Sequence, residues 1–254
     1  MNIIVSGWPA AGSTTLALML AYSLGYSYLY GGSIMKQLAE ALYGDSSGES
    51  LLRFEEEFGS YFDHIWDEYA LWKLQRSDKL LLEGKVTGFF ADDEKIYEIM
   101  VVASPDVRMA RVNRDKRLYS VETLRKRDEE LKSRWLAEYG LDIFNPLLIQ
   151  ESFDLIIDNS RLSIAEEVDT VLQNLEEDYR FPKDDLTSLR DKTKELENIF
   201  WKEGKQHFVS ILQQKQLLIE TKDVFADWRK HFAARLQSWP QELLQIIDTK
   251  VAAK

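Results

Sequence analysis

The residues between positions 7 and 15 have the types and spacing needed to bind phosphate. Four residues separate Gly7 from Gly12, and Ser13 and Thr14 follow directly. This spacing is typical of a P-loop, in which glycines let backbone N–H groups converge on phosphate oxygens and the next helix adds its positive dipole end. The predicted ATP-binding residues are Gly7, Ala10, Ala11, Gly12, Ser13, Thr14 and Thr15.

Thr14 stands where a P-loop hydroxyl binds Mg²⁺, whereas Ser13 stands where such loops carry lysine. Glu83 follows an apolar run and is the second predicted metal ligand, because a carboxylate can hold Mg²⁺ or its water shell. The predicted cofactor is therefore Mg²⁺ with ATP. Two alternatives stay open: a loop that is only a structural turn or binds another anion, and a glutamate at a surface strand end.

A second concentration of charge lies between Arg108 and Arg134, with ten basic and five acidic residues in a chain of net charge −11. One basic segment on an acidic protein suggests a local anion site. The alternative is a solvated helix with ion pairs between residues four apart.

Five short apolar runs, at 3–5, 26–30, 80–82, 96–102 and 155–157, alternate with stretches long enough for helices. This alternation predicts an α/β fold with a five-stranded parallel sheet and helices on both faces. The clearest helix is 13–24, which ends at Gly25. Loops that follow parallel strands meet at one edge of the sheet, so the P-loop and Glu83 are expected there.

From residue 184 to 254 the apolar positions recur at helical spacing without a strand-like run of similar strength. We expect a helical C-terminal extension that forms a hairpin of long helices. It would pack on the core of its own chain, on a second copy of the chain or on a protein partner. Trp201, Trp228 and Trp239 are expected to be packing anchors rather than ligand contacts.

Composition excludes several classes of function. The chain has no cysteine, so it has no disulfides, iron–sulfur cluster or cysteine nucleophile. Its negative charge argues against nonspecific binding to nucleic acid or to anionic membranes. No apolar run approaches the roughly 20 residues of a membrane span, and no signal peptide is visible, so we expect a cytoplasmic protein.

Six segments in order resemble the short cytidylate kinases of the P-loop nucleoside monophosphate kinase superfamily. The resemblance extends from residue 1 to about residue 177, which suggests a kinase-like domain at 1–180 with a lid at about 108–134. The matching segments are 3–15, 31–39, 81–91, 107–115, 139–143 and 153–158.

The resemblance implies ATP-dependent phosphoryl transfer to CMP or dCMP. It assigns the lid arginines to catalysis, since cations must neutralise charge on the transferred phosphoryl group. These are Arg108, Arg111, Arg114, Arg127 and Arg134. The implied acceptor-binding residues are Ser33, Lys36, Asp63, Asp67, Gly84 and Lys85.

Lys36 and Lys85 depart from the family, which usually has arginine at both positions. The positive charge is kept, but the planar guanidinium is not, so this departure concerns the identity of the acceptor. Asp63 and Asp67 lie one helical turn apart and could accept from the cytosine amine, or could form an exposed acidic face. Two alternative functions follow: a P-loop kinase for another small metabolite, and an inactive nucleotide-binding scaffold with a partner-binding helical arm.

Overall fold

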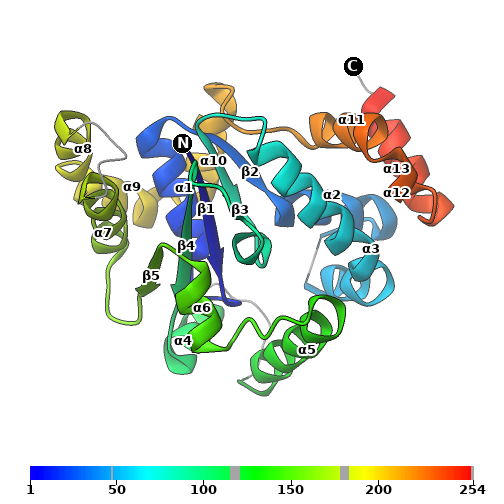
Figure 1. Cartoon of the computed structure of the whole chain (residues 1–254), viewed down its shortest axis with the longest axis horizontal. Coiled ribbons are helices and arrows are strands. Elements are labelled where there is room, and N and C mark those ends of the chain that lie inside the picture. The colour runs from blue at the N-terminus through cyan, green and yellow to red at the C-terminus, as the bar shows by residue number, and fades with distance from the viewer. Residues whose placement is uncertain (47, 115–120, 178–182, 253–254) are drawn as a thin grey trace.

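Five parallel strands in the order β2-β3-β1-β4-β5 form the centre of the computed structural model (Figure 1). The structure describes residues 1–46, 48–114, 121–177 and 183–252. Ile3 of the central strand pairs with Leu81 on one side and Tyr97 on the other. The predicted five-stranded parallel fold is thus confirmed. The strands are β1 (Asn2–Gly7), β2 (Ser27–Tyr30), β3 (Leu80–Glu83), β4 (Ile96–Val102) and β5 (Leu155–Asp158).

Helices cover both faces of this sheet because successive strand side chains point to opposite sides. Ile3 and Val5 belong to a core shared with α1 (Ser13–Leu24) and α7 (Ile164–Glu177). Ile4, between them, belongs to a core shared with α2 (Gly31–Tyr43) and α3 (Gly48–Leu74). The remaining elements of the first 177 residues are η1 (Thr87–Phe89), α4 (Pro105–Arg114), α5 (Val121–Tyr139) and α6 (Pro146–Ser152).

The helix predicted at 13–24 is present with those bounds. Gly25 ends it in the left-handed conformation, with a φ of 65°, and donates its N–H to the Ala21 carbonyl. Glycine adopts this backbone conformation at no steric cost, so the sequence places the end of the helix correctly.

The C-terminal extension consists of short helices rather than the expected hairpin of long ones, so that prediction is wrong. A glycine at 204 with a φ of 77° separates two of them, because this conformation cannot continue a helix. In the described residues the extension comprises α8 (Lys183–Arg190), α9 (Thr193–Glu203), α10 (Lys205–Gln214), α11 (Thr221–His231), α12 (Ala233–Leu236) and α13 (Gln241–Ala252).

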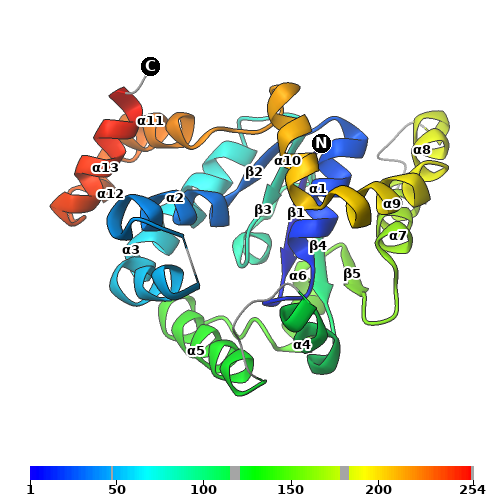
Figure 2. The same cartoon turned by 180° about the vertical axis from the view of Figure 1, so that it is seen from behind.

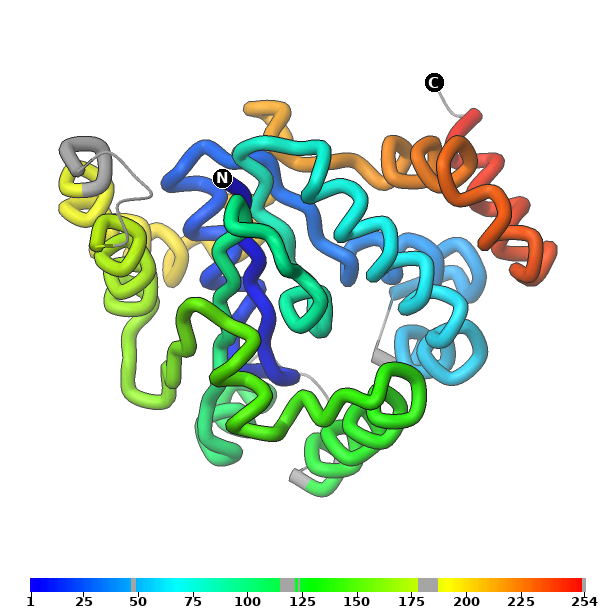
Figure 3. The backbone as a smooth tube through the Cα atoms, in the orientation of Figure 1, coloured from blue at the N-terminus to red at the C-terminus, as the bar shows by residue number. Residues whose placement is uncertain are grey.

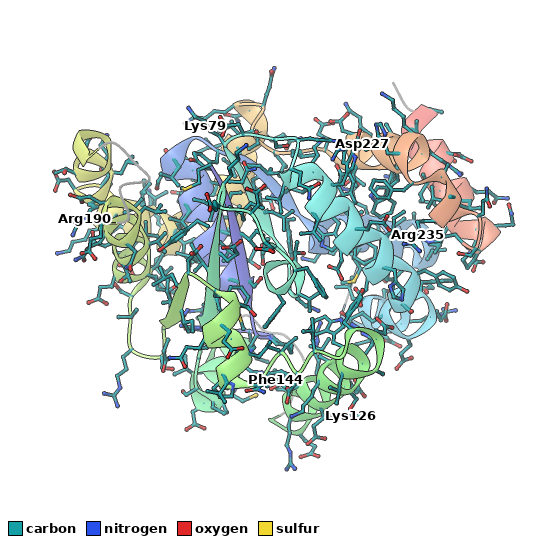
Figure 4. All side chains as sticks on the ribbon, viewed as in Figure 1. Lys79, Lys126, Phe144, Arg190, Asp227 and Arg235 are labelled. Carbon is teal, nitrogen blue, oxygen red and sulfur yellow. The ribbon has the colours of Figure 1, made fainter. Side chains whose placement is uncertain are left out.

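The extension packs against both sides of the molecule. Figure 2 shows α10 lying across α1 and α9 continuing toward α7, and Phe200 and Phe208 join the core on that side. Figure 3 shows the chain then passing to the α2 and α3 side, where Phe225 and Trp228 join the other core. In Figure 4, Arg190 of α8 and Arg235 of α12 accordingly lie at opposite ends of the molecule.

Between these two groups of helices the extension pairs with the edge strand β2. The Tyr28 N–H donates to the Leu217 carbonyl at 2.7 Å, and the Ile219 N–H donates to the Tyr28 carbonyl at 3.0 Å. The short parallel bridge covers backbone groups that an edge strand would otherwise leave unpaired. Among the described residues, no helix is both long and apolar enough to span a membrane.

Substitution of Trp228 measures how much the packing of the extension contributes to the free energy of unfolding. Its side chain is fully buried and lies against the rings of Phe62, Tyr69 and Trp239. We predict that Trp228→Ala lowers the free energy of unfolding by about 3–5 kcal/mol, because it leaves a large cavity. Trp201→Ala is the matched control, since Trp201 is 53% exposed, and should cost about 1 kcal/mol or less. Urea unfolding followed by circular dichroism measures both; equal effects would contradict the prediction.

Candidate active site

The candidate site lies where the strands end. The P-loop follows β1, Glu83 closes β3 and Asn159 follows β5, so all three reach the same edge of the parallel sheet. The Asn159 N–H donates to the Val102 carbonyl at 3.0 Å and so continues the pairing of β5 with β4. The topology therefore gathers residues that are up to 150 positions apart in the sequence.

Two residues of the P-loop have positive φ angles, 61° at Ala10 and 105° at Gly12. A Cβ atom at Gly12 would lie 3.2 Å from Asn159 Nδ2 and 3.4 Å from an Arg111 nitrogen. Glycine is thus required at this position both by the backbone conformation and by the close neighbours.

Three side chains donate hydrogen bonds to carbonyl groups of the P-loop. Arg108 Nε donates to the Pro9 carbonyl at 2.8 Å. Asn159 Nδ2 donates to the Ala11 carbonyl at 2.8 Å, and Arg111 donates to the same oxygen. In the first turn of α1 the Thr15 N–H donates to the Gly12 carbonyl at 2.9 Å. N–H groups that precede this bond, at the start of the helix, are suited to receive an anion.

Arg108 also joins the P-loop to the predicted lid. It is buried, and its terminal nitrogen donates to both carboxylate oxygens of Asp128 on α5, at 2.7 and 2.6 Å. Arg108 and Arg111 therefore position the loop in this structure. The stretch 115–120 of the predicted lid lies outside the described residues.

Thr14 and Glu83, the two predicted metal ligands, are in contact. Thr14 Oγ1 donates to Glu83 Oε1 at 2.6 Å, the Ser13 hydroxyl donates to the same oxygen at 3.3 Å, and the Tyr28 hydroxyl donates to Oε2 at 2.6 Å. Glu83 is 7% exposed, so the alternative of a surface glutamate is wrong. Burial raises its pKa, against the effect of these hydrogen bonds.

This pair suits Mg²⁺ bound together with a nucleotide. Hydroxyl and carboxylate oxygens are the ligands that Mg²⁺ prefers, and the ion usually completes its shell with phosphate oxygens and water. In the part of the chain that the structure describes, no three His, Asp or Glu side chains are grouped to hold a metal.

A second cluster forms where α3 faces α5. Arg127 lies 3.1 Å from Glu55, and Arg134 lies 3.0 Å from Asp63. Asp67, one turn further along α3, is 7% exposed. The alternative of an exposed acidic face is therefore wrong for this segment, because the basic helix α5 covers it.

Lys85 joins the same cluster from the loop after β3. Its ammonium lies 3.9 Å from Glu55 and 5.8 Å from the centre of the Trp135 ring. Partial burial lowers the pKa of this ammonium, while Glu55 opposes the effect; 40% of the side chain remains accessible. The structure thus brings Lys85 and Arg127 to Glu55, and Arg134 to Asp63, one of the two predicted base-recognition carboxylates.

Asp67 is the most perturbed carboxyl of this cluster. Burial, assisted by the nearby charge of Asp63, raises its pKa to about 8. Tyr139 donates to Asp67 Oδ2 at 3.1 Å and acts in the opposite direction. Asp67 is therefore largely protonated at neutral pH and can donate a hydrogen bond as well as accept one.

Three predicted acceptor residues do not join the cluster through their side chains. Lys36 is exposed on α2. Ser33 donates its hydroxyl to the Tyr30 carbonyl at 2.7 Å, within the start of the same helix. Gly84 packs closely, since a Cβ atom there would lie 2.6 Å from the Thr87 hydroxyl.

Arg114 lines the pocket at the P-loop, with its guanidinium 4.9 Å from the centre of the Trp201 ring. The expectation that Trp201 is a buried anchor is wrong, because it is 53% exposed and lines the pocket at the P-loop. The pocket combines the P-loop with the start of α7 and with the extension. Its lining is Ala10, Gly12, Ser13, Thr14, Thr15, Arg111, Arg114, Leu162, Ser163, Ile164, Glu167, Phe200, Trp201 and Lys205.

Sequence reasoning missed several residues of the site. Asn159 holds the P-loop, Glu55 pairs with the lid cations, and Tyr139 bonds Asp67. Glu167 is buried beside Asn159, and burial raises its pKa to about 7. Asn159 lies two residues after the predicted strand 155–157, which is a usable signal. Tyr139 lies in the matching segment 139–143, but neither it nor Glu55 shows in the sequence which partner it meets, because the partners are about 70 positions away.

The chain is similar to curated cytidylate kinases. It is 32% identical over 171 residues to that of Pyrobaculum neutrophilum, a match covering 65% of this chain and 88% of the relative. It is 34% identical to that of Pyrobaculum calidifontis with the same coverage, and 27% identical over 186 residues to that of Archaeoglobus fulgidus, covering 69% and 95%.

No protein-family model matches the chain. Among solved structures, it is similar to the shikimate kinase from Acinetobacter baumannii in complex with shikimate, with a TM-score of 0.47 and 17% identity, covering 70% of this chain and 93% of that one.

Gly12 provides a test of the phosphate loop. We predict that Gly12→Ala weakens Mg-ATP binding at least tenfold, about 1.4 kcal/mol, because the added methyl group strains the backbone and displaces Asn159. Gly25→Ala is the matched control: its φ is 65°, so it carries similar strain, but it lies outside the loop. Isothermal titration calorimetry measures the affinities, and an equal change in both variants would show that only general destabilisation occurred.

The raised pKa of Asp67 predicts that the stability of the fold depends on pH. This pKa of about 8 lies above the ordinary value of 3.8, so the folded state binds this proton more tightly than the unfolded state. The resulting stabilisation is full below pH 4 and is lost as the pH rises through 8. From pH 5 to 9 the free energy of unfolding should fall by about 2–4 kcal/mol more in wild type than in Asp67→Asn.

Asp92→Asn, which changes an exposed carboxylate, is the control and should retain the wild-type pH dependence. Urea titrations at each pH supply the free energies. Parallel curves for wild type and Asp67→Asn would contradict the raised pKa.

Proposed function

This chain belongs to the cytidylate kinase family, and from that premise we propose that it transfers the γ-phosphoryl group of ATP to the phosphate of CMP or dCMP. The coarser conclusion, a P-loop kinase that uses a nucleotide, follows from the family and the fold. The choice of acceptor and the roles of individual residues are the proposal.

The observation that carries the proposal is the connection of two charged sites by the end of β3. Glu83 bonds Thr14 at the P-loop, and Lys85, two residues later, lies beside Glu55 in the α3–α5 cluster. A donor site and an acceptor site must adjoin, because phosphoryl transfer depends on placing the attacking and leaving oxygens in line. The segment 83–85 supplies a residue to each.

On the donor side, the P-loop N–H groups would bind the β and γ phosphates, with Thr14 and Glu83 holding Mg²⁺. When bound, the ion neutralises phosphate charge and orients the phosphates. Arg108, Arg111 and Asn159 keep the loop in shape through its carbonyls. Their role is to preserve the geometry that brings the γ phosphate toward the acceptor.

On the acceptor side, Lys85, Arg127 and Arg134 would bind the monophosphate. Each now lies near Glu55 or Asp63, so an arriving phosphate would compete for cations that are already gathered and partly desolvated. An acceptor phosphate oxygen would then attack the γ phosphorus, and ADP would leave. Cations placed in advance stabilise the charge that spreads over the equatorial oxygens.

Asp63 and Asp67 support a cytosine acceptor. Cytosine presents an amine donor beside the ring acceptor N3. A carboxylate oxygen of this pair can accept from the amine, while the proton held by Asp67, whose pKa is about 8, can be donated to N3. A different small-metabolite acceptor is the second candidate, favoured by the exposure of Lys36, which leaves one expected phosphate contact outside the cluster.

An acceptor panel tests the function. ADP release with Mg-ATP is measured for CMP, dCMP, UMP, AMP and GMP, with the folded state checked by circular dichroism. We predict that kcat/KM for CMP or dCMP exceeds that of every other monophosphate by at least about tenfold. ATP binding without turnover on any acceptor would refute the kinase proposal and favour the scaffold alternative.

Paired variants of α5 link the activity to the cluster. Arg134→Met should lower kcat/KM for CMP by about a hundredfold while Mg-ATP affinity stays unchanged. Arg125→Met is the control, because Arg125 lies on the same helix with 72% of its side chain exposed. Equal activity of the two variants would mean that the cluster does not bind the acceptor.

A further inference from the structure

The P-loop has no cation of its own at the position where such loops carry lysine. Ser13 stands there, and its hydroxyl donates to Glu83 at 3.3 Å. Two arginines of the kinase-like part line the pocket: Arg111 donates to the Ala11 carbonyl and to Asn159, and the Arg114 guanidinium lies over the Trp201 ring. The remaining cation among the described lining residues comes from another element.

The extension reaches the same pocket. Lys205 lines it together with Ser13 and Thr14, and it is the only lysine among the described residues of the lining. Figure 2 shows how this occurs: α10 lies across α1, the helix that begins at the P-loop. A residue 192 positions after Ser13 thus borders the phosphate loop.

Core packing fixes the position of Lys205. It is the first residue of α10, directly after Gly204, whose φ of 77° breaks the helix between α9 and α10. Phe208, one turn along α10, is 1% exposed and packs edge-on against Tyr22 of α1, with ring centres 5.3 Å apart. Leu212 is fully buried in the same core. The helix carrying Lys205 is thus locked to the helix carrying the P-loop.

Lys205 also lies at the part of the loop that meets Glu83. It shares the pocket lining with Ser13 and Thr14, and the hydroxyls of these two residues donate to the Glu83 carboxylate. A cation at this pocket therefore faces the start of the P-loop helix, where an anion is expected to bind.

We infer that Lys205, supplied by the C-terminal extension, is the cation that binds the donor phosphates in place of the missing P-loop lysine. The inference rests on the proposed function in that the donor is Mg-ATP. It gives the extension a part in the active site: α10 is held against α1 so that a lysine from outside the kinase-like part completes the loop. A compact ammonium on a flexible stem is well suited to a phosphate contact.

Lys205→Met, which keeps the length and apolar stem of the side chain, is the direct test. We expect Mg-ATP binding by calorimetry to weaken at least about tenfold, and kcat with the best acceptor to fall about a hundredfold. Lys202→Met is the matched control: Lys202 lies in α9 with 82% of its side chain exposed and pairs with Glu203. It should match wild type in both measurements.

A rescue variant separates charge from packing. Ser13→Lys restores a cation at the usual P-loop position, so the double variant Ser13→Lys with Lys205→Met should recover most of the lost affinity and rate. Full activity of Lys205→Met, or a loss that Ser13→Lys leaves unrestored in a folded protein, would overturn the inference. Calorimetry needs no acceptor, so Lys205-dependent ATP binding without turnover on the panel would refute the proposed function and leave this inference standing.

Discussion

The buried carboxylate of Glu83 is the interaction on which the site depends. A carboxylate removed from water is costly unless donors surround it. Here three hydroxyls donate to it: that of Tyr28 on the neighbouring strand, and those of Ser13 and Thr14 at the start of α1. Satisfying one buried group thus fixes the P-loop helix relative to the sheet, and the site follows from that placement.

Ion pairs also hold together the two helices of the proposed acceptor site, α3 and α5. Glu55 and Asp63 of α3 lie against Arg127 and Arg134 of α5, so the helices are held by groups that a phosphate can also use. Buried ion pairs add little net stability, because the cost of desolvation offsets their attraction. What these pairs do in the structure is gather Arg127 and Arg134 at one place, where the proposed acceptor phosphate would meet them.

The C-terminal extension packs into both hydrophobic cores of the molecule. It contributes Phe200 and Phe208 to one core and Phe225 and Trp228 to the other, and its segment 217–219 pairs with the edge of β2. Apolar side chains that the sequence suggested for a partner-binding arm are used within the molecule. Because α10 packs on α1 and buries Phe208 there, Lys205 at the start of α10 comes to line the pocket at the P-loop.

The sequence by itself determined the elements and the local motifs. The β-branched strand runs, the helix ending at Gly25 and the glycine spacing before Thr14 are local, since each depends on backbone preferences over a few residues. Only the tertiary structure decided which charges meet. Three placements join distant positions: Asn159 at the P-loop, Glu55 at Arg127, and Lys205 in the pocket with Ser13. The order of the strands and the burial of apolar helix faces set these placements. Neither leaves a periodic pattern in the polar residues that are brought together.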